Sequence, residues 1–194
     1  HSGFECSTTE LVDQIKRYKS YIDTSGGGVT VSGGEPLLQI DFLIELFKKL
    51  KKLKIHTAID TSGIIPINDK IKELLSYTDL VLLDIKHIDN KKCIDLTGAS
   101  NKNTLEFAKY LSDQNIAIWI RQVLVPGVTD DEKDLKKLKS FLETLNSVKR
   151  IEILPYHNMG KFKWEEFGET YPLKDIPLPN NEQIINAKNI LGIE

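Results

Sequence analysis

An acidic and a basic side chain follow an apolar run that is typical of a buried strand. Asp84 and Lys86 come directly after the run 80–83, and their spacing of two would place both on one face of a strand. Such a pair either forms a structural ion pair, at a high desolvation cost, or holds a zwitterionic ligand. In the second case Lys86 would bind the carboxylate of the ligand.

A single arginine ends another apolar run. Arg121 follows residues 116–120, so its guanidinium needs an anionic partner. Asp84, Asp60 or a ligand could supply the negative charge. Asp60 itself begins the stretch 60–63, Asp-Thr-Ser-Gly, which is typical of an Asx-turn and equally suits a polar binding site.

A glycine pair follows the β-branched run 29–32. The stretch 33–36 reads Gly-Gly-Glu-Pro, and paired glycines usually indicate a tight turn. Two residues without Cβ also let a ligand approach the backbone. No Gly-Lys-Ser or Gly-Lys-Thr follows, so the turn is not a phosphate-binding loop of the P-loop type.

A histidine follows the last apolar run of this kind. His157 comes after the run 150–154, and a histidine in a loop is more often a surface residue than a ligand contact. Its place after a predicted strand keeps both interpretations open. Lys161, Lys163 and Trp164 follow it as a basic and aromatic cluster, which is typical of a solvated loop.

The elements that carry these residues alternate strictly between helix and strand. We expect helices at 7–22, from 41 onward, and at 68–77, 101–113, 130–145 and 182–191, and strands at 29–32, 56–60, 80–86, 116–125 and 150–154. This alternation favours an α/β fold with a parallel sheet, either open or closed into a complete or partial barrel. Such folds place their sites at the carboxyl ends of the strands, so the polar groups above should meet at one rim.

The composition is that of an ordinary cytoplasmic domain. The chain has 194 residues, 40% hydrophobic, with a net charge of -2, which predicts a single domain over 1–194 and disfavours nucleic acid as a partner. It shows no membrane-spanning apolar run and no signal peptide at its start, so we expect no membrane partner. Cys6 and Cys93 lack metal-ligand spacing and are interpreted as free thiols.

Five stretches, in order along the chain, carry a family resemblance. They are 29–36 with Gly-Gly-Glu-Pro, 56–63 with Asp-Thr-Ser-Gly, 82–86 with Asp-Ile-Lys, 119–127 with Trp-Ile-Arg and Pro-Gly, and 154–164 with Pro-Tyr-His. Together they resemble the radical S-adenosylmethionine enzymes, and among these the activating enzymes of glycyl-radical proteins. The pyruvate formate-lyase activating family is the most similar.

The resemblance implies a fold and a set of binding residues. The fold would be a partial (β/α)6 barrel of the TIM-like, radical S-adenosylmethionine type, here without its first strand. S-adenosylmethionine would bind at Gly33, Gly34, Glu35, Asp60, Asp84, Ile85, Lys86, Arg121 and His157. The resemblance also implies a monovalent cation held by Asp60, Thr61 and Asp84.

The resemblance further implies radical chemistry and two protein partners. In that family a 4Fe–4S cluster reduces the sulfonium by one electron, and the resulting 5'-deoxyadenosyl radical takes a hydrogen from a glycine Cα. The glycine would belong to pyruvate formate-lyase, and flavodoxin or ferredoxin would supply the electron.

The cysteines depart from the family pattern. The family holds its cluster with a C-x3-C-x2-C loop, which Cys6 and Cys93 cannot form. We expect that loop and the first strand to precede this chain in a longer parent. The chain alone should then bind no cluster, be inactive, bind S-adenosylmethionine weakly, and expose the strand 29–32 as a sheet edge.

Two other functions remain open from the sequence. The chain could activate a different glycyl-radical enzyme, such as a glycerol dehydratase or a decarboxylase. It could also be a non-catalytic binding or scaffold protein that never held a cluster. The N-terminal sequence of a longer parent would separate these alternatives.

Overall fold

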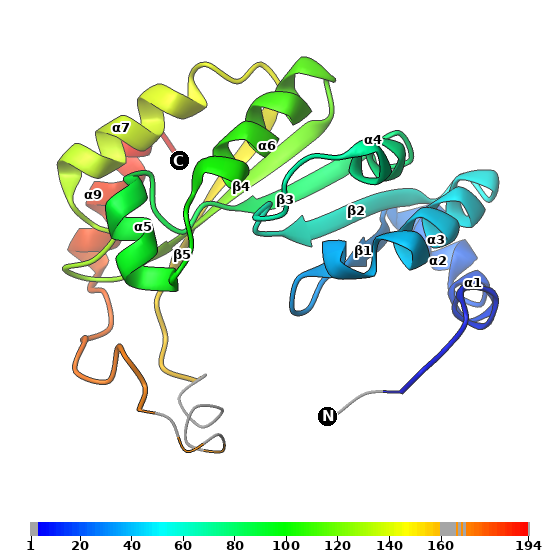
Figure 1. The fold of residues 1–194 in the computed structure, drawn as a ribbon, viewed down its shortest axis with the longest axis horizontal. Helices are drawn as coiled ribbons and strands as arrows, with labels where there is room; N and C mark the ends of the chain where they lie inside the picture. The colour runs from blue at the N-terminus through cyan, green and yellow to red at the C-terminus, as the bar shows by residue number, and fades with distance from the viewer. Residues whose placement is uncertain (1–3, 160–165, 167, 169, 194) are drawn as a thin grey trace.

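The computed structural model describes residues 4–159, 166, 168 and 170–193, and its strands form one parallel sheet (Figure 1). The strand order follows the chain, and every neighbouring pair is parallel. The strands are β1 (Gly28–Val31), β2 (His56–Thr61), β3 (Leu80–Asp84), β4 (Ala117–Leu124) and β5 (Val148–Pro155). Because β1 and β5 are both edges, the described sheet is a partial barrel, as predicted.

Helices connect the strands in sequence. They are α1 (Thr8–Lys16), α2 (Lys19–Ser25), the 3-10 helix η1 (Pro36–Gln39), α3 (Ile40–Lys52), α4 (Asp69–Leu75), α5 (Asn90–Thr97), α6 (Lys102–Asp113), α7 (Glu132–Leu142) and α9 (Asn181–Leu191). In Figure 1, α3 and α4 lie near the β1 edge of the sheet, and α7 and α9 pack together near the β5 edge. Among the described residues, none of the helices has the length and apolar character needed to span a membrane.

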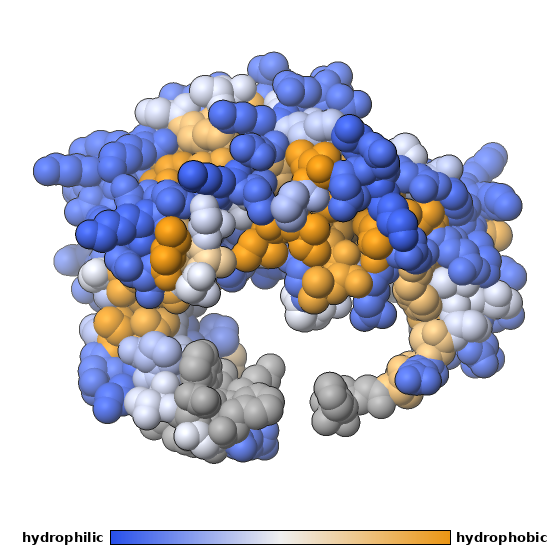
Figure 2. Space-filling model, in the orientation of Figure 1, coloured by the Kyte–Doolittle hydropathy of each residue, from blue (hydrophilic) through white to orange (hydrophobic). Residues whose placement is uncertain are grey.

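The core lies between one face of the sheet and the helices. Burial alternates along β4: Ile118 and Ile120 are fully buried, whereas Trp119 and Arg121 on the opposite face remain partly exposed. The buried face packs against helical side chains such as Phe107 of α6. Figure 2 shows a hollow between the N-terminal stretch and the segment that follows β5, with apolar surface on its wall.

The first predicted helix is two helices. Ser7 forms the expected capping box, because its hydroxyl accepts from the Glu10 amide and the Glu10 carboxylate accepts from the Ser7 amide. The single helix predicted over 7–22 is wrong, since α1 ends at Lys16 and α2 begins at Lys19. The amide of Tyr18 donates to the carbonyl of Ile15, a tight turn that separates the two helices and leaves the Tyr18 side chain exposed.

The segment after β3 also differs from the prediction. The strand ends at Asp84 and not at Lys86, and an unpredicted helix, α5, follows it. The side chain of Asp89 caps this helix by accepting from the Lys92 amide, and Gly98 ends it in the left-handed conformation. Cys93 is its only buried residue, so the sequence shows no apolar periodicity there.

Candidate functional site

The glycine turn presents its backbone to open space. Gly33 and Gly34 have φ angles of 93° and 54°, a region that L-residues rarely adopt, and a Cβ added to either would meet no atom within 4 Å. Both residues are exposed. The turn predicted from sequence is therefore confirmed, and its amides and carbonyls are accessible to a ligand.

The side chain of Glu35 ties this turn to the end of β2. One carboxylate oxygen accepts from the Leu37 amide at 3.2 Å and the Thr61 hydroxyl at 2.6 Å. The other accepts from the amide and the hydroxyl of Ser62, at 3.1 and 2.6 Å. These contacts occupy the Glu35 carboxylate with protein donors, so its side chain positions the glycine turn.

Arg121 pairs with Asp60, one of the partners considered from sequence. Its Nη1 lies 2.6 Å from Asp60 Oδ2, and the two side chains are 26% and 22% exposed. The Ser32 hydroxyl donates to the same Asp60 oxygen at 3.2 Å. This chain of contacts joins the ends of β1 and β2 to β4 across the half-exposed face.

Asp84 and Lys86 form the second ion pair of the rim. Lys86 Nζ lies 2.5 Å from Asp84 Oδ2, and Asp84 is the register neighbour of Arg121 across β3 and β4. Two buried atoms here have no hydrogen-bond partner among the described residues: Asp84 Oδ1 and Arg121 Nε. An unpaired acceptor and an unpaired donor on neighbouring strands suit a ligand that both donates and accepts hydrogen bonds.

A depression of about 640 Å³ collects three of the predicted residues, Lys86, Arg121 and His157. Its wall includes Val123, Leu154, Pro155, Tyr156, Leu96, Tyr171 and Leu173. The structure thus brings the ends of β3, β4 and β5 to one rim, as expected for a parallel α/β fold. A second depression of about 650 Å³ adjoins it and shares Leu96, Tyr171 and Leu173.

Two tyrosines in this wall were not predicted as site residues. Burial raises the pKa of Tyr171 to about 12, and a hydrogen bond with Tyr156 adds to the effect. The hydroxyl of Tyr156, in turn, donates to the Leu173 carbonyl at 3.2 Å. Tyr156 lies within the Pro-Tyr-His stretch noted in the sequence, whereas no motif pointed to Tyr171.

The remaining predicted residues differ in which of their atoms could contact a ligand or a cation. The Ile85 side chain is fully buried, so only its backbone could contact a ligand. Thr61 is 3% exposed, and its hydroxyl contacts Glu35 and the Gly63 amide, so a cation beside Asp60 could use only its carbonyl. His157 is exposed. The cluster of Lys161, Lys163 and Trp164 lies outside the described residues.

The residues present do not fit a 4Fe–4S cluster but do fit S-adenosylmethionine. The chain has two cysteines, fewer than a cluster loop needs, with Cys6 half-buried and Cys93 buried. In the described part of the chain, no group of three or more His, Cys, Asp or Glu residues is placed to hold a metal ion. By contrast, the open glycine turn and the two buried atoms without a described hydrogen-bond partner, at the end of β3 and within β4, suit a polar organic ligand.

Comparison with known proteins decides the family. The model of the Radical SAM superfamily matches residues 3–138. A pyruvate formate-lyase-activating enzyme of Staphylococcus epidermidis is 50% identical over 94% of this chain and 75% of its own length. The enzyme of the same name from Listeria monocytogenes is 48% identical over 98% of this chain and 79% of its own length. The chain belongs to the radical SAM superfamily, in the family of the pyruvate formate-lyase-activating enzymes.

One solved structure agrees with this family, and a second shares the fold alone. A domain of the pyruvate-formate lyase-activating enzyme from Bacteroides vulgatus is 28% identical, with a TM-score of 0.71 over 86% of this chain and 93% of that domain. SuiB of Streptococcus suis shares the fold, at 18% identity and a TM-score of 0.69 over 97% of this chain and 42% of its own. The resemblance noted in the sequence is confirmed, and the family match covers β1 to β4 with their rim residues.

Proposed function

We propose that this chain supplies the S-adenosylmethionine-binding wall of a pyruvate formate-lyase-activating enzyme. The observation that carries the proposal lies at the end of β3 and in the middle of the neighbouring β4. There Asp84 Oδ1 and Arg121 Nε lie buried with no hydrogen-bond partner among the described residues, and Lys86 pairs with the other Asp84 oxygen. The relatives' shared name and about 50% identity support the same assignment.

The rim would bind the ligand through groups of opposite character. Asp84 Oδ1 would accept from the ammonium or a ribose hydroxyl, and Arg121 Nε–H and Lys86 would donate to the carboxylate. The backbone of Gly33, Gly34 and Ile85 would add contacts. His157 would also contact the ligand, since it lines the same depression as Lys86. A bound cluster would supply the electron that cleaves the sulfonium, and these residues only bind and orient.

The partner's glycine segment would reach the site along the second depression. This depression joins the first through Leu96, Tyr171 and Leu173, so an extended chain lying in it would end at the rim. Three carboxylates also line it: Asp95, Asp130 and Asp131. Lys92 is the one lysine among the described residues of this wall, and it already pairs with Asp134. We therefore expect a basic residue next to the reacting glycine.

The remaining assignments belong to the same proposal. The chain would form a single domain in the cytoplasm, act on pyruvate formate-lyase, and receive its electron from flavodoxin or ferredoxin. With two cysteines it would hold no cluster and would be inactive alone. Losing the anchor that a cluster provides would weaken S-adenosylmethionine binding by a factor of ~100 or more.

Calorimetry with S-adenosylmethionine tests the binding site. We expect measurable binding by the chain, about tenfold weaker binding by Lys86→Ala, and unchanged binding by the exposed control Lys109→Ala on α6. Equal binding by Lys86→Ala would remove Lys86 from the site. A chain that binds no S-adenosylmethionine at millimolar concentration would refute the proposed function and would favour a scaffold role.

A further inference from the structure

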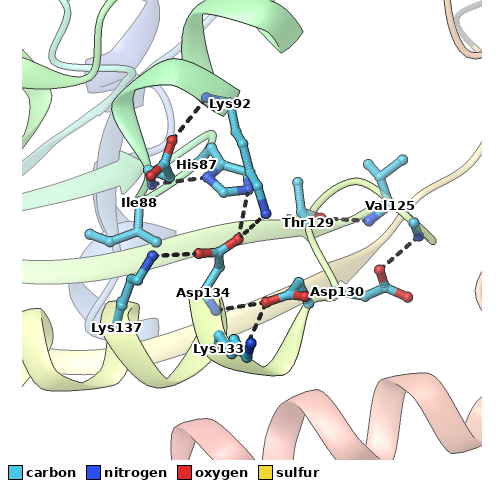
Figure 3. A network of polar contacts seen from close by, with 12 residues as sticks. His87, Ile88, Lys92, Val125, Thr129, Asp130, Lys133, Asp134 and Lys137 are labelled. Carbon is cyan, nitrogen blue, oxygen red and sulfur yellow. Dashed lines mark hydrogen bonds and ion pairs between the residues drawn. The ribbon is translucent and has the colours of Figure 1, made fainter.

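A polar node lies where the segment after β3 meets α7, and Figure 3 shows its His87 and Asp134 side by side. It contains His87, Gln122 and Asp134, which are 2%, 3% and 5% exposed. All three line a small cavity of about 10 Å³ between the end of β3, β4 and α7. Such deep burial requires that each polar atom find a partner, because an unpaired one is destabilising.

Two atoms in this node have no hydrogen-bond partner among the residues the structure describes. One is His87 Nε2, and the other is Gln122 Oε1. The Nδ1 of His87 accepts from the Asp89 amide at 3.0 Å, which assigns the proton of the neutral ring to Nε2. The nearest oxygen of Asp134 lies 3.8 Å from Nε2, beyond hydrogen-bonding distance.

The charges around the cavity indicate a neutral occupant. Asp134 already pairs with Lys92 and Lys137, at 2.5 and 3.1 Å. A cation would face the Nε2–H of His87, and an anion would face the carboxylate of Asp134. A water molecule suits both, because it can accept from the histidine and donate to Gln122 and Asp134. The cavity is about the size that one water requires, roughly 10–15 Å³.

We propose that one ordered water binds in this cavity and joins His87, Gln122 and Asp134. It would accept from His87 Nε2–H and donate to Gln122 Oε1 and Asp134 Oδ2. Three hydrogen bonds are typical of a conserved buried water. The water would connect the segment after β3 to β4 and to α7.

This water site also positions Lys86 and Arg121, and the role of these two residues in binding rests on the proposed function. His87 directly follows Lys86, and Gln122 directly follows Arg121. Because successive strand residues point to opposite faces, Gln122 faces the cavity while Arg121 faces the rim. The amide of Ile85 also bonds to the Arg121 carbonyl at 3.0 Å. Fixing the helix side of these two segments fixes where Lys86 and Arg121 lie.

A high-resolution crystal structure of the wild-type chain tests the water site. We expect one water peak within hydrogen-bonding distance of His87 Nε2, Gln122 Oε1 and Asp134 Oδ2. In solution, NMR should show a cross-peak between a long-lived water and the Nε2 proton of His87. A cavity without density, a cation in it, or a His87 ring bonded directly to Asp134 would overturn the proposal.

Calorimetry with S-adenosylmethionine tests the positioning role. Gln122→Leu removes the acceptor at similar size, and we expect about fivefold weaker binding than wild type. The matched control is Ser147→Ala, which removes another buried polar side chain without a described hydrogen-bond partner, directly before β5 and at the opposite end of that strand from the rim. Equal affinities of Gln122→Leu and wild type, or an equal loss in Ser147→Ala, would overturn the positioning role.

These experiments distinguish a failure of the proposed function from a failure of the water site. If the wild-type chain binds no S-adenosylmethionine, the proposed function and the positioning role both fail, while the crystal structure still decides the water site. If Gln122→Leu does not fold, His87→Gln, which retains a side-chain N–H donor, should keep near-wild-type affinity. A loss of affinity in folded His87→Gln as large as in His87→Leu would then refute the role of the donor.

Discussion

Removing the Glu35 carboxylate should detach the glycine turn from β2 and destabilise the chain. The carboxylate accepts four hydrogen bonds, from the Leu37 amide, the Thr61 hydroxyl, and the amide and hydroxyl of Ser62. At about 0.5–1.5 kcal/mol net for each, these bonds sum to about 2–6 kcal/mol. Glu35 is only half-buried, so water replaces part of the loss, and we expect Glu35→Ala to cost about 2–3 kcal/mol.

The conservative variant Glu35→Gln should lose part of the same stability. Glu35→Gln keeps one accepting oxygen and replaces the other by an amide that cannot accept. We therefore expect about half the loss, roughly 1–1.5 kcal/mol. The assay is urea unfolding followed by circular dichroism, with the exposed Glu106→Ala of α6 as a control that should stay within about 0.5 kcal/mol of wild type.

Hydrogen exchange would show where the loss arises. In Glu35→Ala the amides of Gly33, Gly34 and Ser62 should exchange faster, while those of β4 should change little. If Glu35→Ala unfolds at the same urea concentration as wild type, the hydrogen bonds of the Glu35 carboxylate do not stabilise the chain. If Glu35→Gln loses as much stability as Glu35→Ala, the count of accepted hydrogen bonds does not explain the effect.

Three further predictions concern the sheet edge, the acid range and the partner. The β1 edge should support self-association, which the exposed edge variant Thr30→Lys should reduce in sedimentation experiments, and a wild-type chain that stays monomeric at high concentration would contradict this. Burial alone would raise the pKa of Asp134, but hydrogen bonds from Lys92 and Lys137 outweigh this effect and lower the pKa below 3.8. The ionised Asp134 therefore stabilises the fold above about pH 4, and this contribution is lost as the pH falls through the folded pKa. The free energy of unfolding should then fall less steeply with decreasing pH in Asp134→Asn than in wild type. Equal slopes would show that Asp134 does not contribute to the acid dependence. Asp95→Lys should weaken binding to pyruvate formate-lyase about 3- to 10-fold at low salt in surface plasmon resonance, whereas Asp113→Lys at the far end of α6 should not, and equal effects would exclude the second depression as the binding path.

Local patterns in the sequence were sufficient to predict most of the elements. The β-branched run 29–32 and the apolar run 80–83 both lie in strands, since such residues pack well on a buried pleated surface. The Ser7 capping box and the Gly33–Gly34 turn appear where predicted, because each depends on residues close in the chain. Helix α5 was missed because it buries only one residue, although Asp89 and Gly98 marked its ends.

The partners of the site residues depended on the tertiary structure. Arg121 and Asp60 are 61 residues apart. The register places Asp84 directly beside Arg121, yet the guanidinium pairs with Asp60 of β2, and Asp84 pairs with Lys86. The tyrosine pair in the wall likewise joins β5 to a segment without a motif of its own.

The sequence by itself determined the order of the strands and of most helices, the glycine turn and the family. These follow from short-range spacing, which the chain carries in any conformation. Only the tertiary structure decided that Asp84 Oδ1 and Arg121 Nε have no hydrogen-bond partner in the described part of the chain, and that His87, Gln122 and Asp134 share one cavity. Burial and unsatisfied hydrogen bonding arise from packing between distant segments, and no local pattern encodes them.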